Sequence, residues 1–148
     1  MDSDKKKVAR ILKGIRKQLT APLYAAKKIK YIEGKAKKMS KKMTWPEREF
    51  KKMMNELGVD IVCQKIVGGK IYDFYEEKTN TLFEVDGNYF HGDKELYGEL
   101  NAMQKRNIKN DEYKNIIALG YGYKIERIWE SDLKNDYNGI KKRMRKLL

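Results

Sequence analysis

The stretch Leu82–Asp93, LFEVDGNYFHGD, concentrates side chains that could do chemistry. It carries Glu84, Asp86 and the only histidine of the chain, His91. Carboxylates are ligands for hard divalent cations, and an imidazole can serve as a general base near neutral pH. Alternate side chains of a strand share a face, so Glu84 and Asp86 are expected to point the same way. A lone histidine is more often a surface residue or a satisfied core residue, and that alternative stays open.

Asp73 is expected to join this acidic group from the neighbouring strand. The pattern predicts strands over Lys70–Tyr75 and Thr81–Asp86, joined by a turn at Thr79-Asn80. Such a hairpin would bring Asp73 near the Glu84–Asp86 end of its neighbour. Clustered carboxylates repel one another in a partly dry site unless a cation compensates them. The sequence therefore predicts a divalent cation here, and Mg²⁺ fits oxygen ligands of this kind best.

Glu47 lies on the inward stripe of a predicted helix. Thr44-Trp45-Pro46-Glu47 is typical of a helix start, and the helix is expected to end at Leu57 before Gly58. Glu47 stands three residues before Phe50, which begins the apolar stripe, so its carboxylate is expected to need a partner. The alternative to a role in the site is a capping box, in which Glu47 bonds the Thr44 amide.

The remaining pattern favours an α/β fold. Further strands are expected over Ile61–Ile66 and Tyr123–Trp129, with Gly68-Gly69 as the first hairpin turn. Helices are expected over Ala102–Leu119 and from a Ser131 cap to the C-terminus. The expected architecture is a sheet with helices packed on its faces. Asp93 has no role here except to cap the segment after it.

The charge of +13 is concentrated in the first 42 residues. Residues 1–42 hold 15 Lys/Arg against 3 Asp/Glu, whereas residues 43–148 hold 19 against 18. A basic arm on a near-neutral domain is typical of a protein that binds polyanions, nucleic acid above all. A solubilising tail or a membrane-surface helix is the alternative. Helical spacing over Val8–Leu19, and more weakly over Leu23–Met39, could equally serve to form a homo-oligomer.

Composition excludes several classes of protein. No apolar run is long enough to span a membrane, and the basic N-terminus lacks the apolar core of a secretory signal. The single cysteine, Cys63, supports neither an internal disulfide nor a cysteine-based zinc site, so we expect a cytoplasmic protein. Phosphate-binding and dinucleotide-binding glycine motifs are missing, so no small-molecule cofactor is expected.

The order of these motifs resembles a known family. The motifs follow one another in this order: W-P-E (45–47), V-C-Q (62–64), Asp73, F-E-V-D-G-N-Y-F-H (83–91), an Asp on a helix and G-Y-K-I-E-R-I-W-E (122–130). This order resembles that of the very-short-patch repair endonuclease and its Vsr-like EDxHD homing endonuclease relatives. Both belong to the PD-(D/E)XK nuclease superfamily. The resemblance covers about residues 43–132 and implies a restriction-endonuclease-like core with a central mixed sheet.

The resemblance also implies roles for single residues. Asp73 matches the metal-binding aspartate, Val85 a position whose main-chain carbonyl can hold the metal, and His91 the family histidine. Glu47 matches the helix glutamate, and Asp111 the last aspartate. The usual superfamily lysine is missing, because Asp86 takes its place, and this favours the histidine variant. Glu84 and Asp86 are extra acids, each either a further metal ligand or a structural group.

These observations together predict a Mg²⁺-dependent DNA endonuclease, with Mn²⁺ able to substitute, and a phage-type homing endonuclease above all. The alternatives are a mismatch- or structure-directed nicking nuclease of the same fold and a non-catalytic nucleic-acid-binding protein. Residues 1–42 are expected to form a basic helical arm and residues 43–148 the nuclease domain. Tyr89 and Phe90 match the aromatic pair that wedges into DNA, although either could be core. Contacts to double-stranded DNA are further expected from Lys5, Lys6, Lys7, Arg10, Lys13, Arg16, Lys17, Lys27 and Lys28.

Overall fold

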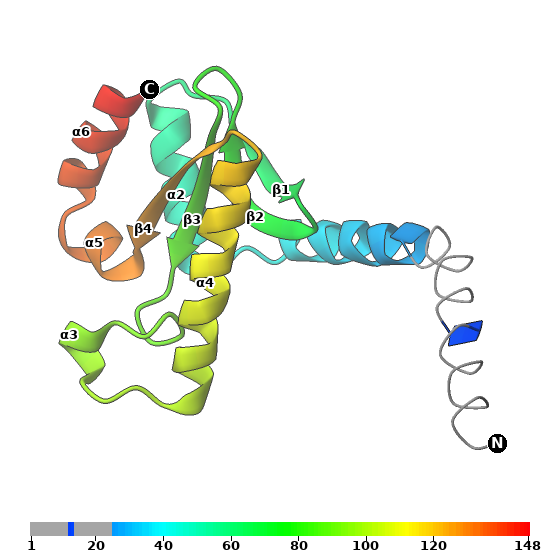
Figure 1. Ribbon diagram of the computed structural model, residues 1–148. Coiled ribbons are helices and arrows are strands. Elements are labelled where there is room, and N and C mark those ends of the chain that lie inside the picture. Colours follow the sequence, from blue (N-terminus) through cyan, green and yellow to red (C-terminus); the bar gives the residue numbers. More distant parts are fainter. Residues whose placement is uncertain (1–11, 14–24) are drawn as a thin grey trace.

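The computed structural model describes residues 12–13 and 25–148. Residues 25–40 form a helix that extends from the rest of the fold toward the N-terminal end (Figure 1). Its Ala36 is buried, whereas most of its other side chains are exposed. This helix falls within the predicted Leu23–Met39 stretch and ends one residue later; the predicted start at Leu23 lies outside the described residues. The predicted helix over Val8–Leu19 lies outside the described residues, apart from Leu12 and Lys13, which are helical.

Helix α2 (Trp45–Glu56) forms where the helix-start signal predicts it. Pro46 occupies the first turn, and Gly58 follows the last turn with a φ of +69°. A left-handed backbone at this position is readily adopted by glycine, which explains why the helix stops here. Phe50 heads the apolar stripe and is fully buried. The predicted capping box does not form, because the Thr44 side chain makes no hydrogen bond at the helix end.

Four strands form one mixed sheet in the order β1-β2-β3-β4. The strands are β1 (Val62–Val67), β2 (Lys70–Glu76), β3 (Thr81–Asp86) and β4 (Lys124–Trp129). The first three pair antiparallel, and β4 pairs parallel to β3. The predicted α/β class with a mixed sheet flanked by helices is therefore confirmed, with strand ends differing from the predicted ones by one residue at most.

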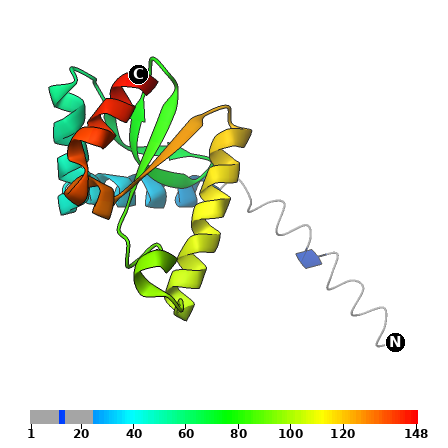
Figure 2. The ribbon, with the colours of Figure 1, turned by 90° about the vertical axis from the view of Figure 1, so that its left-hand side faces the viewer.

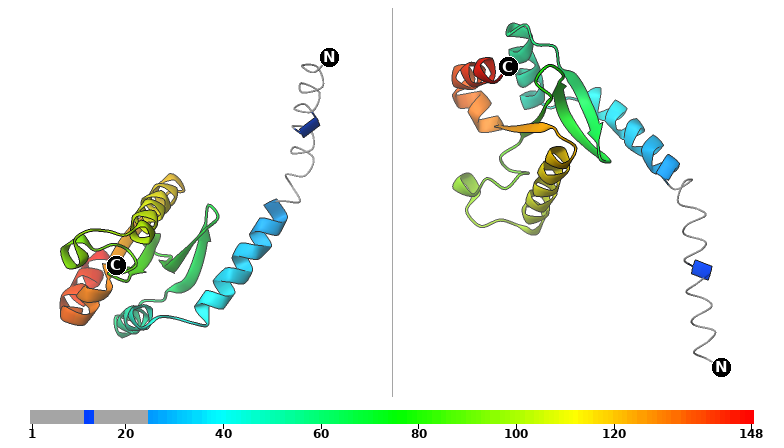
Figure 3. Two further views of the ribbon diagram at one scale, coloured as in Figure 1. Left: turned by 90° about the horizontal axis from the view of Figure 1, so that it is seen from below. Right: turned by 45° about the horizontal axis from the view of Figure 1, so that its top comes forward.

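Helices cover both faces of this sheet (Figures 1 and 2). On one face α2 packs with α5 (Glu130–Asn135) and α6 (Tyr137–Leu147) around a core that contains Phe50, Phe83 and Ile128. On the other face α4 (Ala102–Gly120) covers a smaller cluster that contains Tyr72 and Leu82. Adjacent residues of β3, Leu82 and Phe83, thus belong to different cores, which explains why the whole strand is buried. Seen from below, α4 and α2 lie at opposite sides of the strands (Figure 3).

Two helical predictions need correction. Ser131 does not cap the last helix, because it lies inside α5, and the chain breaks again at Asp136 before α6 begins. The Asp136 carboxylate accepts a hydrogen bond from the Gly139 amide at 3.0 Å and so caps α6. A short helix, α3 (Lys94–Tyr97), was not predicted. Asp93 is its N-cap, in agreement with the capping role left open for it.

No helix within residues 12–13 and 25–148 is long and apolar enough to cross a membrane.

Candidate metal centre

Asp73 occupies an irregular position in β2. Its neighbours Tyr72 and Phe74 pack on opposite faces of the sheet, although residues two apart in a regular strand share a face. Asp73 itself forms no ladder pair with β3. Its Oδ2 instead accepts a hydrogen bond from the backbone N–H of Val85 at 2.9 Å. The side chain therefore takes the place of a backbone acceptor and fixes the carboxylate beside the end of β3.

The environment of Asp73 opposes its negative charge. Burial raises its pKa to about 6, and the carboxylates of Glu47 and Asp86 add to that rise. The Val85 hydrogen bond and the ammonium of Lys114 act in the opposite direction but do not cancel it. A carboxyl group whose pKa is raised to about 6 by burial is one that a bound cation would keep ionised.

Glu84 is buried on the face of the sheet that α4 covers. Its Oε1 lies 2.5 Å from the Nζ of Lys114, which is itself almost buried. Burial raises the pKa of Glu84 to about 7, and the charge of Asp73 contributes in the same direction. Lys114 lowers it only in part. The pair of Asp73 and Glu84 therefore shares one nearby ammonium group, which is less positive charge than two ionised carboxylates need.

Asp86 lies two residues farther along β3, on the same face as Glu84. Its Oδ2 accepts a hydrogen bond from the guanidinium of Arg127 at 2.7 Å. Its buried Oδ1 has no hydrogen-bond partner in the part of the chain that the structure describes, and it lies 3.4 Å from the His91 Nδ1. Glu84 and Asp86 thus point to the same face of the sheet, as the strand alternation predicts. Lys114 of α4 binds Glu84 there, and Arg127 of β4 binds Asp86.

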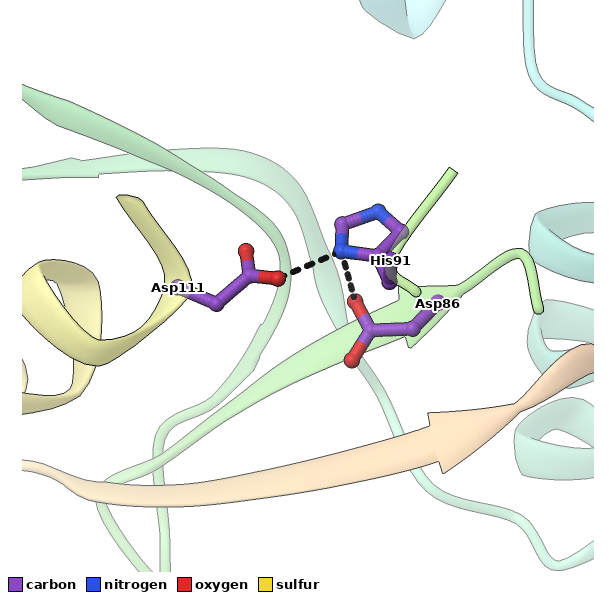
Figure 4. A group of neighbouring side chains, drawn as sticks. All are labelled: Asp86, His91 and Asp111. Carbon is purple, nitrogen blue, oxygen red and sulfur yellow. Dashed lines mark hydrogen bonds and ion pairs between the residues drawn. The ribbon is translucent and has the colours of Figure 1, made fainter. Parts of the chain in front are cut away.

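His91 returns toward the sheet after a tight turn. Its backbone N–H donates to the Gly87 carbonyl at 3.0 Å. The loop is tied down by Asn88, whose side chain bonds both the amide and the hydroxyl of Ser131. These bonds bring the His91 Nδ1 to 2.6 Å from Asp111 Oδ2 (Figure 4). The chain thus places a histidine from a loop against a carboxylate from the middle of α4.

The His91–Asp111 contact determines what the imidazole can do. Burial lowers the pKa of His91, but the hydrogen bond to Asp111 and the charge of Asp86 outweigh it, so the pKa is raised. An ionised carboxylate can only accept, so Nδ1 must carry the shared proton. In the neutral ring the lone pair is then on Nε2, which points away from both carboxylates (Figure 4). His91 is therefore held in the tautomer of a general base.

Asp86, His91 and Asp111 also form a candidate metal-binding group. Each offers one ligand atom, and these atoms lie within 4.8 Å of one another. Arg127 competes with a cation at this place, because its guanidinium contacts Asp86 at 2.7 Å and lies 3.6 Å from Asp111. Asp73 contacts no arginine among the described residues, and the positive charge of Lys114 does not offset its burial. The acidic group as a whole suits a hard cation, and Asp73 is the member whose chemistry fits one best.

The structure brings together five of the predicted site residues, and it places Glu47 and Val85 next to them. Contacts and shared electrostatics connect Asp73, Glu84, Asp86, His91 and Asp111. Glu47 is half-buried and acts on Asp73 through its charge, without a direct hydrogen bond among the described residues. Val85 is buried with its N–H bonded to Asp73. The predicted DNA contacts Lys5, Lys6, Lys7, Arg10, Arg16 and Lys17 lie outside the described residues, and Lys13, Lys27 and Lys28 are exposed.

Sequence reasoning missed Lys114 and Arg127, the two cations of the site. Lys114 follows Asp111 by three residues, so both lie on one face of α4. Arg127 pairs with Glu84 in the β3–β4 register, and it shares its face with the apolar Ile125. The signal in the sequence is therefore spacing: Lys114 lies three residues after Asp111 on a helix, and Arg127 lies two residues after Ile125 on a strand.

An aromatic cluster projects beside the His91 loop. Tyr89 and Phe90 are 47% and 58% exposed, and their rings meet edge to face at 5.3 Å. Tyr97 of α3 meets Tyr89 in the same way at 5.4 Å. Gln104 and Asn107 of α4 donate to the backbone carbonyls of Tyr89 and Phe90, respectively. The cluster is thus a rigidly held, exposed apolar surface rather than part of the core.

A basic groove lies between the helix over residues 25–40 and α4. Its lining includes four lysines and no acid: Lys28, Lys35, Lys70 and Lys114. Lys70 is held in place by a 2.9 Å hydrogen bond to Asn110. Because Lys114 also contacts Glu84, the groove reaches the acidic site from the side of the N-terminal helix. Such a path suits a polyanionic chain.

No family model matches the sequence, and none of the curated proteins matches it. Among solved structures, the chain is similar to the catalytic domain of the homing endonuclease I-Bth0305I, with a TM-score of 0.53 and 25% sequence identity. The match covers 71% of this chain and 94% of the other. By its fold, the protein is therefore similar to a homing endonuclease catalytic domain, and it carries an acidic and histidine group that could hold a metal ion.

Proposed function

We propose that this protein is a metal-dependent DNA endonuclease that hydrolyses phosphodiester bonds, of the Vsr-like EDxHD type found among homing endonucleases. The observation that carries this proposal is the cluster of buried acids next to the His91–Asp111 pair, in a chain similar to a homing endonuclease catalytic domain. Hydrolysis requires an activated water and compensation of the charge that develops on the phosphate. The two parts of the site correspond to these two needs.

The acidic part would hold the cation. Asp73 is the principal ligand, assisted by the Val85 carbonyl, while Glu84 and Asp86 act mainly through their ion pairs with Lys114 and Arg127. A divalent cation such as Mg²⁺, or Mn²⁺ in its place, supplies Lewis-acid polarisation of the phosphate and lowers the pKa of water. Glu47 orients water at the edge of this cluster.

The histidine part would move the proton. His91 accepts the proton of the attacking water at Nε2, because Nδ1 is engaged by Asp111. Asp111 holds the ring in this tautomer and stabilises the imidazolium that forms. Arg127 supports the pair by contacting both Asp86 and Asp111.

The surroundings of the site supply the DNA contacts in this proposal. The four lysines of the basic groove bind the phosphate backbone, and residues 1–42 form a basic arm that extends this contact or joins two copies. Tyr89 and Phe90 stack on or wedge between bases, since they are exposed and held by α4. The domain proper then comprises residues 43–148.

Plasmid cleavage tests the proposal. Supercoiled plasmid is incubated with the protein in Mg²⁺, in Mn²⁺ and in EDTA, and DNA binding is measured separately in Ca²⁺. We expect nicking or linearisation only with Mg²⁺ or Mn²⁺, none by Asp73→Ala or His91→Ala, and nearly unchanged binding by both variants. Asp60→Ala, which alters an exposed acid in a loop outside the site, serves as the matched control.

Two outcomes would favour the alternatives. DNA binding with a steep salt dependence, but no cleavage in either metal, would indicate a non-catalytic binding protein. Preference for mismatched or branched duplexes over plain ones, measured on a panel of each, would indicate a structure-directed nicking nuclease. Full cleavage by both the Asp73 and the His91 variants would exclude the mechanism itself.

A further inference from the structure

Gln64 of β1 is a buried residue with an unusual lack of partners. Neither Nε2 nor Oε1 of its carboxamide has a hydrogen-bond partner among the described residues, although only 6% of the residue is exposed. Gln104, the other buried glutamine in the described part of the chain, is fully engaged: its Oε1 accepts from Asn101 and its Nε2 donates to Tyr89. A buried amide without a partner destabilises the fold, so a group outside the protein is expected to bind it.

The register of the sheet places Gln64 opposite Asp73. Cys63 pairs with Phe74, and Lys65 pairs with Tyr72, so the unpaired position between them belongs to Gln64 and Asp73. Phe74 packs on the α2 face and Tyr72 on the α4 face, so the regular alternation breaks at this one position. Both unpaired residues of the ladder therefore lie at the same irregularity.

The backbone of Gln64 is itself strained. Its φ is +55°, in the left-handed region that residues other than glycine rarely adopt, and it lies inside a strand rather than at a turn. Strain of this kind is retained where the surrounding structure requires a particular side-chain placement. Gln64 thus combines a strained backbone with an unpartnered buried carboxamide, next to the acid that fits a cation best.

We infer that Gln64 is a further ligand of the cation site, with its Oε1 providing a neutral oxygen to the divalent cation that Asp73 would hold, or to a water of that cation. This inference rests on the proposed function. An amide suits the place better than a third carboxylate, because Asp73, Glu84 and Glu47 already exceed the positive charge of Lys114. The carboxamide adds an oxygen donor without adding repulsion.

Replacement of the carboxamide by an apolar chain of similar length tests the inference. Mn²⁺ affinity is measured by calorimetry without DNA, and thermal unfolding is measured in EDTA and in Mn²⁺, for the wild type, Gln64→Met and the control Gln104→Met. For Gln64→Met we expect Mn²⁺ affinity to fall about tenfold or more. Its melting temperature in EDTA should be equal to or higher than that of the wild type, because an unsatisfied polar group has been removed.

The control is expected to behave in the opposite way. Gln104→Met loses the capping box of α4, so its melting temperature in EDTA should fall while its Mn²⁺ affinity stays unchanged. Gln64→Glu, which keeps an oxygen at the site, should keep its Mn²⁺ affinity or increase it and lose stability in EDTA. Loss of Mn²⁺ affinity by the Glu variant comparable with that of the Met variant would contradict the inference.

Three further outcomes are decisive. Unchanged Mn²⁺ affinity of Gln64→Met would overturn the inference, and so would a lower melting temperature of that variant in EDTA, which indicates a purely structural residue. Failure of the wild type to bind Mn²⁺ at all would instead overturn the metal-dependent function on which the inference rests. The two failures are therefore distinguished by the wild-type titration alone.

Discussion

The Nδ1 of His91 lies 2.6 Å from the Oδ2 of Asp111, although one residue follows β3 and the other lies in the middle of α4. This distance is that of a charge-assisted hydrogen bond. Each residue is also connected to the sheet: His91 contacts Asp86, and Asp111 contacts Arg127. The relative position of α4 and the sheet therefore fixes the geometry of the proposed general base.

Asp111→Asn is expected to reduce the cleavage rate by roughly 10²–10⁴-fold with little effect on DNA binding. An asparagine can donate its amide hydrogen to Nδ1, which would move the ring proton to Nε2 and block the acceptor. Single-turnover cleavage in Mg²⁺ and binding in Ca²⁺ measure the two effects separately. Asp60→Asn, the same change at an exposed loop position, should cleave as the wild type does. A rate within twofold of the wild type for Asp111→Asn would contradict the assigned role.

The sheet could be predicted from the sequence because its signals are local. Alternating apolar residues and the Gly68-Gly69 turn determine β1 and β2, and both glycines have the positive φ that such a turn requires. The split of the final helix was missed because an N-cap residue type such as Asp136 does not by itself show that a helix breaks, and its capping bond to Gly139 is visible only in three dimensions.

The candidate site was less accessible to sequence reasoning than the sheet. Residue types and strand spacing selected Asp73, Glu84, Asp86 and His91, whereas Asp111 was selected only through the family resemblance. The ion pair between Glu84 and Lys114 depends on how α4 packs on the sheet, 30 residues apart in sequence, and no local pattern specifies it. The break in alternation at Asp73 is likewise a property of the paired strands.

Lys28 and Lys35 are expected to contact DNA phosphates, because both line the basic groove. The double variant Lys28→Gln with Lys35→Gln should weaken binding uniformly across sequences and reduce the slope of log affinity against log salt by about 2. The matched control changes Lys30 and Lys37, two exposed lysines of the same helix that do not line the groove. Binding titrations at several salt concentrations give the slopes. Equal effects of the two pairs would show that only net charge matters.

Phe90→Ala is expected to impair DNA distortion without destabilising the fold. The ring is 58% exposed, so the free energy of unfolding should change by less than about 0.5 kcal/mol. Loss of a stacking contact should weaken DNA binding by about 1–3 kcal/mol. Fluorescence of 2-aminopurine in a duplex reports base unstacking, which the wild type should increase and the variant should not. Tyr121→Ala removes a similarly exposed ring from the loop after α4 and should give the same fluorescence as the wild type. The wild-type fluorescence for Phe90→Ala as well would exclude the wedge.

Glu76 is expected to make stability depend on pH in the acidic range. Burial opposes the charge of this carboxylate, but its bonds to the Thr79 hydroxyl and to the amides of Thr79 and Lys78 outweigh that effect and lower its pKa. A lowered pKa in the folded state means that the stabilisation is complete above the ordinary pKa of glutamate and is lost as the pH falls through the folded value. Glu76→Gln should therefore cost about 1–3 kcal/mol at pH 7 and much less near pH 3.

Urea unfolding of the wild type and of Glu76→Gln at both pH values measures this difference. Glu77→Gln changes the exposed neighbour and should have little effect at either pH. A difference between the wild type and Glu76→Gln that stays the same at pH 7 and near pH 3 would show that the carboxylate charge is not what stabilises the turn.

The ion pair of Glu84 and Lys114 provides a test of whether Glu84 is structural or a metal ligand. Lys114→Met leaves the buried Glu84 without its cation and should cost about 3–5 kcal/mol in the free energy of unfolding. Combining it with Glu84→Gln should recover most of that loss, because no uncompensated charge is then buried. Urea unfolding of both single variants and of the double variant gives the coupling free energy.

Because Lys114 already occupies the Glu84 carboxylate, we expect the double variant to bind Mn²⁺ as the wild type does. A loss of Mn²⁺ binding by the double variant would identify Glu84 as a ligand.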